Sequence, residues 1–106
     1  MKKILIVLLL LIIIIISGCK KEIVDKAAAD CIASKSKLYV LAGCTACAKQ
    51  KEIFGENFQY LNAVDCKISS EECSNKNILK VPTWIIDENK LEGVQSIETL
   101  KRLTGC

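Results

Sequence analysis

Two cysteines three residues apart, Cys44 and Cys47, stand directly after the apolar run at residues 38–42 and before a stretch of helix-forming residues. At such a strand-to-helix junction the first thiol faces the helix N-terminus, whose partial positive charge favours a thiolate. The second thiol, one helical turn further on, lies close enough to form a disulfide with the first. The pattern predicts a dithiol redox site; a structural disulfide or half of a zinc site has the same spacing.

The N-terminus predicts an export signal. Lys2 and Lys3 form a positively charged start, residues 4–16 form an unbroken apolar run, and Ser17-Gly18 precedes Cys19. The apolar run is shorter than the about 20 residues that a comfortable membrane span needs. This arrangement resembles a lipoprotein signal, in which cleavage before the cysteine leaves its thiol to carry lipid. We expect residues 1–18 to be a lipoprotein signal peptide with lipidation at Cys19, or else an uncleaved signal-anchor.

Either form of anchor places the rest of the chain outside the cytoplasmic membrane and tethers it there. Such a space is oxidising, so six further cysteines in a small domain indicate disulfide chemistry. Without Lys2 and Lys3 the basic and acidic residues nearly balance, so no nucleic-acid binding is expected. The chain has no histidine, which excludes imidazole general bases, Cys-His nucleophile pairs and histidine-liganded metals.

The hydrophobic pattern divides the chain into the signal at residues 1–18, a tether with a short helix at 19–36, and one domain at 37–106. In the short helix, Ile23, Ala27 and Cys31 share a stripe, with Val24 beside them. Within the domain we expect strands at residues 37–42, 59–64, 83–86 and 90–92, and helices at 46–54, 71–75 and 97–103. A three-residue loop at 87–89 would join the last two strands. This order predicts an α/β fold with a mixed four-stranded sheet flanked by helices.

Four motifs follow one another along the predicted elements: Cys-Thr-Ala-Cys at 44–47, Gln-Lys-Glu-Ile-Phe-Gly at 50–55, Val-Pro-Thr-Trp at 81–84 and Glu-Gly-Val-Gln-Ser at 92–96. In this order they resemble the thioredoxin fold, and more closely the thioredoxin-like domain that is fused to bacterial homologues of vitamin K epoxide reductase. The resemblance implies a thiol-disulfide oxidoreductase that exchanges disulfides with secreted or cell-surface proteins containing cysteines. It also implies a membrane redox partner similar to vitamin K epoxide reductase. We expect no cofactor and no metal.

The chain departs from the family pattern at two places. The family commonly has Pro-His between the active cysteines, whereas this chain has Thr45-Ala46, so no ring stabilises the Cys44 thiolate from within the motif. A less stabilised thiolate makes the disulfide less oxidising and leaves the direction of electron flow open. We expect oxidation or isomerisation of clients slightly ahead of reduction. Leu38 also occupies the position where thioredoxins carry a buried acid.

Val81 and Pro82 have a role that only the resemblance implies. An arbitrary bond before proline is cis in only about 5% of cases in folded proteins. The thioredoxin fold, however, places a cis-proline opposite the active disulfide, where the preceding residue pairs with a bound substrate strand. We therefore expect Val81 and Pro82 to dock substrate, and Trp84 to lie in the core.

The remaining cysteines form two possible pairs. Cys66 and Cys73 have a spacing that the end of a strand and the first turn of a helix can bridge, either as a structural disulfide or as a second redox pair that relays electrons. Cys31 and Cys106 are left by elimination. Their disulfide would clamp the first helix to the last, and either thiol could instead be free or intermolecular.

Two other functions compete with redox catalysis. One is a metal-binding or metal-delivery module in which Cys44, Cys47, Cys66 and Cys73 supply four thiolates, although the second pair is wider than zinc sites usually have. The other is a lipoprotein whose thioredoxin-like domain only binds partners and whose cysteines are all structural. Free-thiol counting and metal content distinguish the three functions.

Overall fold

The computed structural model describes residues 1–16 and 24–106. The cleavage signature and the expected lipidation site, Cys19, lie outside the described residues. Helix α1 (Lys2–Ile16) contains the apolar run, and its large side chains from Ile4 to Ile12 are exposed. Among the residues described, we find no helix with the length and apolar character that crossing a membrane requires.

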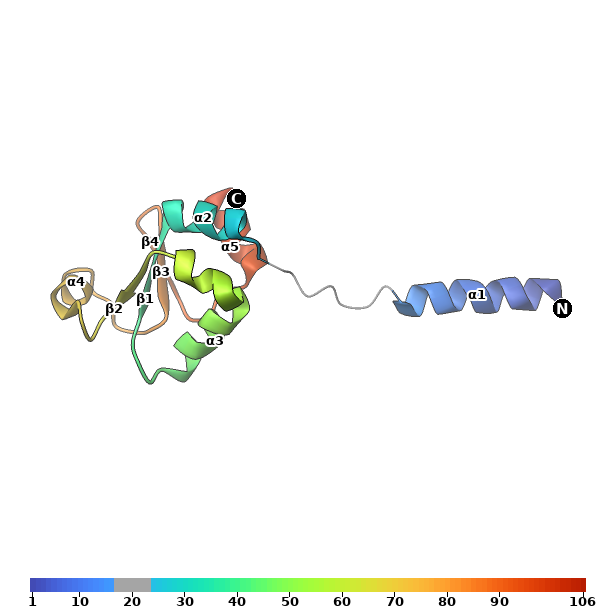
Figure 1. The fold of residues 1–106 in the computed structure, drawn as a ribbon, viewed down its shortest axis with the longest axis horizontal. Coiled ribbons are helices and arrows are strands. Elements are labelled where there is room, and N and C mark those ends of the chain that lie inside the picture. The colour runs from blue at the N-terminus through green and yellow to red at the C-terminus, as the bar shows by residue number, and fades with distance from the viewer. Residues whose placement is uncertain (17–23) are drawn as a thin grey trace.

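One mixed sheet forms the centre of the domain (Figure 1). Its strands are β1 (Ser36–Val40), β2 (Ala63–Asp65), β3 (Thr83–Ile86) and β4 (Asn89–Glu92), in the spatial order β2-β1-β3-β4. Strand β1 pairs with β2 in parallel and with β3 antiparallel, and β3 pairs with β4 antiparallel. The carboxyl ends of β1 and β2 and the start of β3 therefore share one edge of the sheet.

Three helices pack on one face of this sheet and a fourth lies on the other side (Figure 1). The first face is covered by helices α2 (Lys26–Lys35), α3 (Thr45–Phe54) and α5 (Ile97–Thr104). Helix α4 (Ser70–Asn75) follows β2. Its Glu72 accepts a hydrogen bond from the Tyr39 hydroxyl at 3.2 Å and pairs with Lys37, which ties α4 to β1.

The core forms where the three helices meet β1 and β3. Leu38 of β1 and Trp84 of β3 are fully buried, and the Trp84 ring lies 6.0 Å from that of Phe54 in α3. Ile32 of α2 and Leu100 of α5 complete this cluster from the other two helices. Because Leu38 and Trp84 are paired neighbours on one face, they form the surface on which α2, α3 and α5 pack.

Helix α2 belongs to the packed core rather than to a spacer. The buried residues of this region are Val24, Ala29 and Ile32, whereas Ala27 is exposed. The expected stripe through Ala27 is therefore wrong, because Asp25 caps the helix by accepting from the Ala28 N–H, and the buried face follows from that start. The other member of that stripe, Ile23, lies outside the described residues. The hydrophobic core thus includes residues before 37, in the segment at 19–36 that was predicted to be a tether with a short helix.

Three further details differ from the sequence prediction. Residues 59 and 60 end a 3-10 helix, Gly55–Tyr60, and β2 begins only at Ala63. The β3–β4 hairpin has a two-residue loop, in which Asp87 and Glu88 adopt positive φ angles typical of a type I′ turn. Helix α5 extends one residue beyond the predicted end at residue 103, and its buried side runs through Ile97, Leu100 and Thr104.

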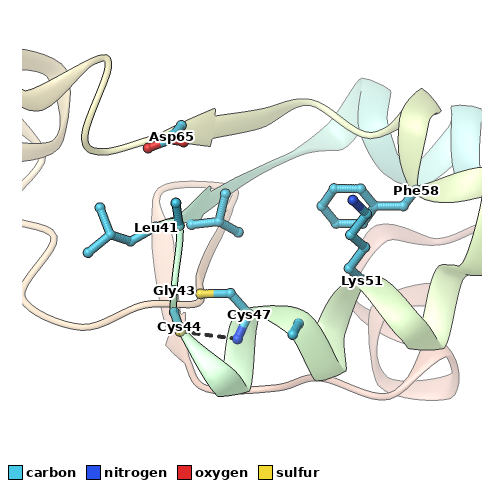
Figure 2. Close-up of a pocket in the computed structure, with 10 residues that line it drawn as sticks. Leu41, Gly43, Cys44, Cys47, Lys51, Phe58 and Asp65 are labelled. Carbon is cyan, nitrogen blue, oxygen red and sulfur yellow. Dashed lines mark hydrogen bonds between the residues drawn. The ribbon is translucent and has the colours of Figure 1, made fainter.

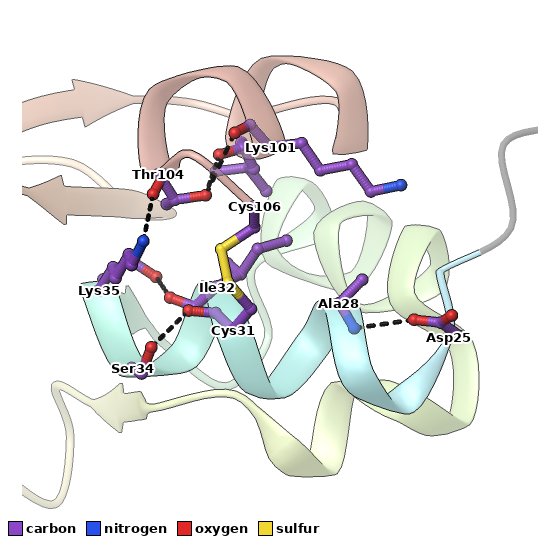
Figure 3. The surroundings of a disulfide bond; sticks show 11 residues. Asp25, Ala28, Cys31, Ile32, Ser34, Lys35, Lys101, Thr104 and Cys106 are labelled. Atoms are coloured by element: carbon purple, nitrogen blue, oxygen red, sulfur yellow. Dashed lines mark hydrogen bonds between the residues drawn. A yellow bond between two sulfur atoms is a disulfide. The ribbon is translucent and has the colours of Figure 1, made fainter.

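A disulfide joins α2 to the end of the chain. Cys31 and Cys106 are bonded across a separation of 75 residues, and the Lys35 ammonium donates to the Thr104 carbonyl at 2.9 Å beside them (Figure 3). Helices α2 and α5 are thus clamped together on one face of the sheet.

Candidate active site

A tight turn delivers Cys44 to the start of α3. The Cys44 N–H donates to the Leu41 carbonyl at 3.3 Å, and Gly43 takes a φ of +81°, a conformation that favours glycine. Cys44 is the N-cap of α3, and its sulfur accepts a hydrogen bond from the Cys47 N–H at 3.1 Å (Figure 2). A cap that accepts from the helix N–H groups is a site at which negative charge on sulfur is stabilised.

The two thiols differ in exposure and in acidity. Cys44 is half-buried, whereas Cys47 is only 7% exposed. The hydrogen bond with the Cys47 side chain, together with the backbone N–H groups of Cys47 and Ala46, lowers the pKa of Cys44. Burial and the contact with Cys44 raise the pKa of Cys47 to about 11. Cys47 therefore keeps its proton at neutral pH, and Cys44 is the more readily ionised and more nucleophilic sulfur.

The start of β3 lies directly against the reactive thiol. In its thiol form Cys44 donates to the Val81 carbonyl at 3.6 Å, and the Val81-Pro82 peptide bond is cis. Val81 is half-buried and Pro82 fully buried. The two residues that the family resemblance assigns to docking thus stand beside Cys44.

A pocket opens beside the pair, between the start of α3 and the end of β2 (Figure 2). Lys51 and Phe58 close one end of it, with the Lys51 ammonium 5.7 Å from the centre of the Phe58 ring. Asp65 lines the opposite wall and accepts from the Lys67 N–H at 2.8 Å. The sequence pattern did not identify Asp65 as part of the site, and the only available signal was its position at the end of a parallel strand.

Gln50 is the second residue near the site that sequence reasoning missed. It lies one turn after Cys47 on the buried side of α3 and is fully buried. Its side chain binds both Trp84 and the backbone of Gln95. A polar residue on the apolar stripe of a short helix was the available signal.

The second cysteine pair lies at the end of the neighbouring strand. Cys66 and Cys73 form a disulfide, and Cys73 is 6% exposed. The Cys66 N–H donates to the Val40 carbonyl at 2.9 Å, so this disulfide follows the strand that pairs with β1. The thiols of Cys44 and Cys47 are the free thiols among the residues described.

The four cysteines of the metal-binding alternative are not present as four thiols. Cys66 and Cys73 are bonded to each other, which removes two of the four thiolates. In the part of the chain that the structure describes, no three side chains of metal-ligating type lie together. A four-thiolate site would require this disulfide to open.

Comparisons with known proteins point to redox chemistry. The chain is 35% identical over 80 residues to thiol-disulfide oxidoreductase LTO1 of Arabidopsis thaliana, a match that covers 66% of this chain and 21% of the relative. The chain thus spans about a fifth of the length of that relative. No family model matches the chain.

A solved structure with a similar arrangement is the N-terminal NTD_N/C domain of alkylhydroperoxide reductase AhpF from Enterococcus faecalis. It is 16% identical to this chain, with a TM-score of 0.47, over 77% of this chain and 45% of that one. The described domain has an α/β fold, with a mixed four-stranded sheet and helices.

Proposed function

We propose that the chain is a thiol-disulfide oxidoreductase that works outside the cytoplasmic membrane, tethered to it, on secreted or cell-surface proteins that contain cysteines. The observation that carries this proposal is the asymmetry of the Cys44–Cys47 pair. One sulfur is half-buried and has a lowered pKa, and its partner is buried with a pKa of about 11. Such an asymmetry assigns attack to Cys44 and resolution to Cys47.

The chemistry consists of two thiol-disulfide exchanges. In the reducing direction, the Cys44 thiolate attacks one sulfur of a client disulfide, a mixed disulfide forms, and the other client sulfur leaves as a thiolate. Cys47 then loses its proton and attacks Cys44, which releases the second client thiolate. The client gains two electrons and the Cys44–Cys47 pair becomes a disulfide. Client oxidation is the same sequence in reverse.

In the oxidising direction the pair must pass its electrons on after each cycle. The four motifs shared with the thioredoxin-like domain of bacterial vitamin K epoxide reductase homologues support a membrane enzyme of that type as the acceptor. An oxidising compartment, in which secreted proteins acquire disulfides, supports oxidation or isomerisation ahead of reduction. The absence of a ring in Thr45-Ala46 places the expected potential toward the reducing half of the family range.

Docking of the client at Val81-Pro82 fits this chemistry. A client backbone that approaches Cys44 meets the Val81 peptide first, because the Val81 carbonyl is 3.6 Å from the sulfur. Backbone pairing at this position gives affinity without a demand on the client sequence. An enzyme that serves many clients benefits from such docking.

Trapping of clients tests the function. In Cys47→Ala the second exchange cannot occur, so mixed disulfides with exported proteins should accumulate on Cys44. Non-reducing gels of cells expressing Cys47→Ala, Cys44→Ala and wild type, followed by mass spectrometry of the adducts, give the readout. If Cys44→Ala trapped clients and Cys47→Ala did not, the two roles would be reversed. If neither trapped any, the oxidoreductase proposal would fail.

Mass spectrometry of the membrane-extracted protein tests the tether. Lys2 and Lys3, the apolar helix α1 and the small residues before Cys19 support cleavage before Cys19 and lipid on its thiol. The expected N-terminus is a lipid-modified Cys19. An intact Met1 with an unmodified Cys19 would contradict the lipoprotein form and leave a signal-anchor.

A further inference from the structure

Gln50 makes three hydrogen bonds to two other segments of the fold. Its Oε1 accepts from the Trp84 Nε1–H at 3.0 Å and from the Gln95 N–H at 2.7 Å. Its Nε2 donates to the Gln95 carbonyl at 3.1 Å. Gln50 is fully buried, so neither segment can exchange these contacts for water without cost.

The paired contact with Gln95 fixes the connection between β4 and α5. Donation to the carbonyl and acceptance from the N–H of the same residue hold both peptide units that flank the Gln95 Cα, as a neighbouring β-strand would. Two residues earlier, the Gly93 N–H donates to the Pro82 carbonyl at 2.8 Å. Between these anchors, Val94 stays 38% exposed beside α3.

A series of hydrogen bonds connects the segment around Cys44 with Gln50. Cys44 contacts the Val81 carbonyl, Pro82 is bonded to Gly93, and Gln95 is bonded to Gln50. Gln50 itself belongs to α3, one turn beyond Cys47. Helix α3 is thus connected to the Val81-Pro82 backbone both through Cys44 and through Gln50, Gln95 and Gly93.

We infer that Gln50 is a positioning residue for client docking. It holds residues 93–95 against α3 and, through the Gly93–Pro82 hydrogen bond, sets the distance between the Val81-Pro82 backbone and Cys44. The inference rests on the proposed function, because a docking distance matters only if a client binds there. The Gln50 side chain bonds to Trp84 and Gln95 and not to the reacting sulfurs. The Cys44 thiolate is stabilised by N–H groups at the start of α3, and these stay in place without Gln50.

The test compares two variants of the full-length protein in detergent. Gln50→Met keeps the length and approximate volume of the side chain and removes all three hydrogen bonds. Trp84→Phe is the matched control, because it removes one hydrogen bond to Gln50 Oε1 and leaves both contacts with Gln95. Each variant reacts with insulin as a protein disulfide, and with dithiobis(nitrobenzoate) as a small disulfide that needs no docking.

For Gln50→Met we expect KM for insulin to rise about tenfold, with kcat and the rate with the small disulfide within about twofold of wild type. Trp84→Phe should keep all three values within about twofold. An equal loss with both disulfides, no loss at all, or the same selective loss in Trp84→Phe would overturn the inference.

Hydrogen exchange and a second substitution test the positioning role of Gln50 further. Amide hydrogen exchange at Gln95 should be about tenfold faster in Gln50→Met than in Trp84→Phe, and equal rates would overturn the positioning role. If Gln50→Met does not fold, Gln50→Glu keeps both acceptor contacts and loses the donation to the Gln95 carbonyl. It should raise KM for insulin by less than about tenfold and leave the rate with the small disulfide within about twofold of wild type; an equal loss with both disulfides would overturn the inference. If wild type failed to react with insulin but reacted with the small disulfide, the proposed function would fail, while the exchange rates at Gln95 would still decide the role of Gln50.

Discussion

Two cysteine pairs stand at the carboxyl ends of neighbouring parallel strands, and their surroundings differ. At the end of β1, the Cys47 N–H points at the Cys44 sulfur. At the end of β2, the N–H of Cys66 is bonded to the Val40 carbonyl, and the N–H of Cys73 to the Ser69 carbonyl. One pair is present as free thiols and the other as a disulfide.

From this difference we expect that position at a sheet edge alone does not make a redox site. A reactive pair needs N–H donors aimed at one sulfur, because they stabilise the thiolate that attacks and leaves. Helix α3, with Cys44 as its N-cap, supplies these donors. The N–H groups of Cys66 and Cys73 bond to backbone carbonyls instead. We therefore assign the relay role to neither Cys66 nor Cys73 and expect their disulfide to be structural.

The largest expected effect separates the pairs by activity. Cys44→Ser should reduce disulfide exchange with insulin by at least about a thousandfold, because the hydroxyl cannot replace the thiolate nucleophile. The double variant Cys66→Ala/Cys73→Ala should keep turnover within about threefold of wild type at a temperature where it is folded. A folded double variant without turnover would revive the relay and remove the contrast between the pairs.

The loss of unfolding free energy on removing each disulfide should increase with the length of the loop that the disulfide closes. Removal of Cys31–Cys106, which spans 75 residues, is expected to lower the free energy of unfolding by about 4 kcal/mol. Removal of Cys66–Cys73, which spans 7, should cost about 2.5 kcal/mol. Urea unfolding of the two double alanine variants, at equal protein concentration, measures both. A greater loss for the shorter loop would show that Cys66–Cys73 supports the fold by contacts rather than by chain entropy.

The smallest expected effect is within the reactive pair, as a function of pH. The pKa of Cys44 is lowered and that of Cys47 is raised to about 11, so Cys44 becomes a thiolate first as pH rises. Alkylation of the reduced protein with iodoacetamide should therefore modify Cys44 with a midpoint below the ordinary thiol value of about 8.5. Cys47 should react only at strongly alkaline pH. Peptide mapping at each pH gives both profiles, and preferential labelling of Cys47 at neutral pH would contradict the assigned roles.

Sequence patterns predicted the order of strands and helices along the chain, because apolar periodicity and caps are local signals. Ser96, which accepts from the Thr99 N–H at the start of α5, is such a cap. The second strand was predicted too early. Residues 59 and 60 instead end a 3-10 helix, because tertiary contacts decide this segment: Asn57 donates to the Val24 carbonyl, and the Lys26 ammonium lies over the Tyr60 ring.

The candidate site also has one part that the sequence predicts and one part that it does not. The spacing of Cys44 and Cys47 is readable because strand, turn and helix N-terminus follow one another in sequence. The hydrogen bonds of Gln50 cannot be read from the sequence, since its partners lie 34 and 45 residues away. Spacing within one segment predicts which atoms react, whereas only the folded chain shows what holds the client-facing backbone beside them.

One redox titration tests the central claim most directly. The full-length protein is equilibrated in buffers of graded glutathione and dithiothreitol potential, alkylated, and mapped by mass spectrometry, so that all three cysteine pairs are measured together. We predict a midpoint for Cys44–Cys47 below about −180 mV but well above the about −270 mV of thioredoxin, with Cys66–Cys73 and Cys31–Cys106 still oxidised below about −300 mV. A Cys44–Cys47 midpoint near −270 mV, about that of thioredoxin, would favour a reductase over an oxidant. Coincident midpoints for Cys44–Cys47 and Cys66–Cys73 would contradict the claim that only the pair at the helix N-terminus exchanges disulfides.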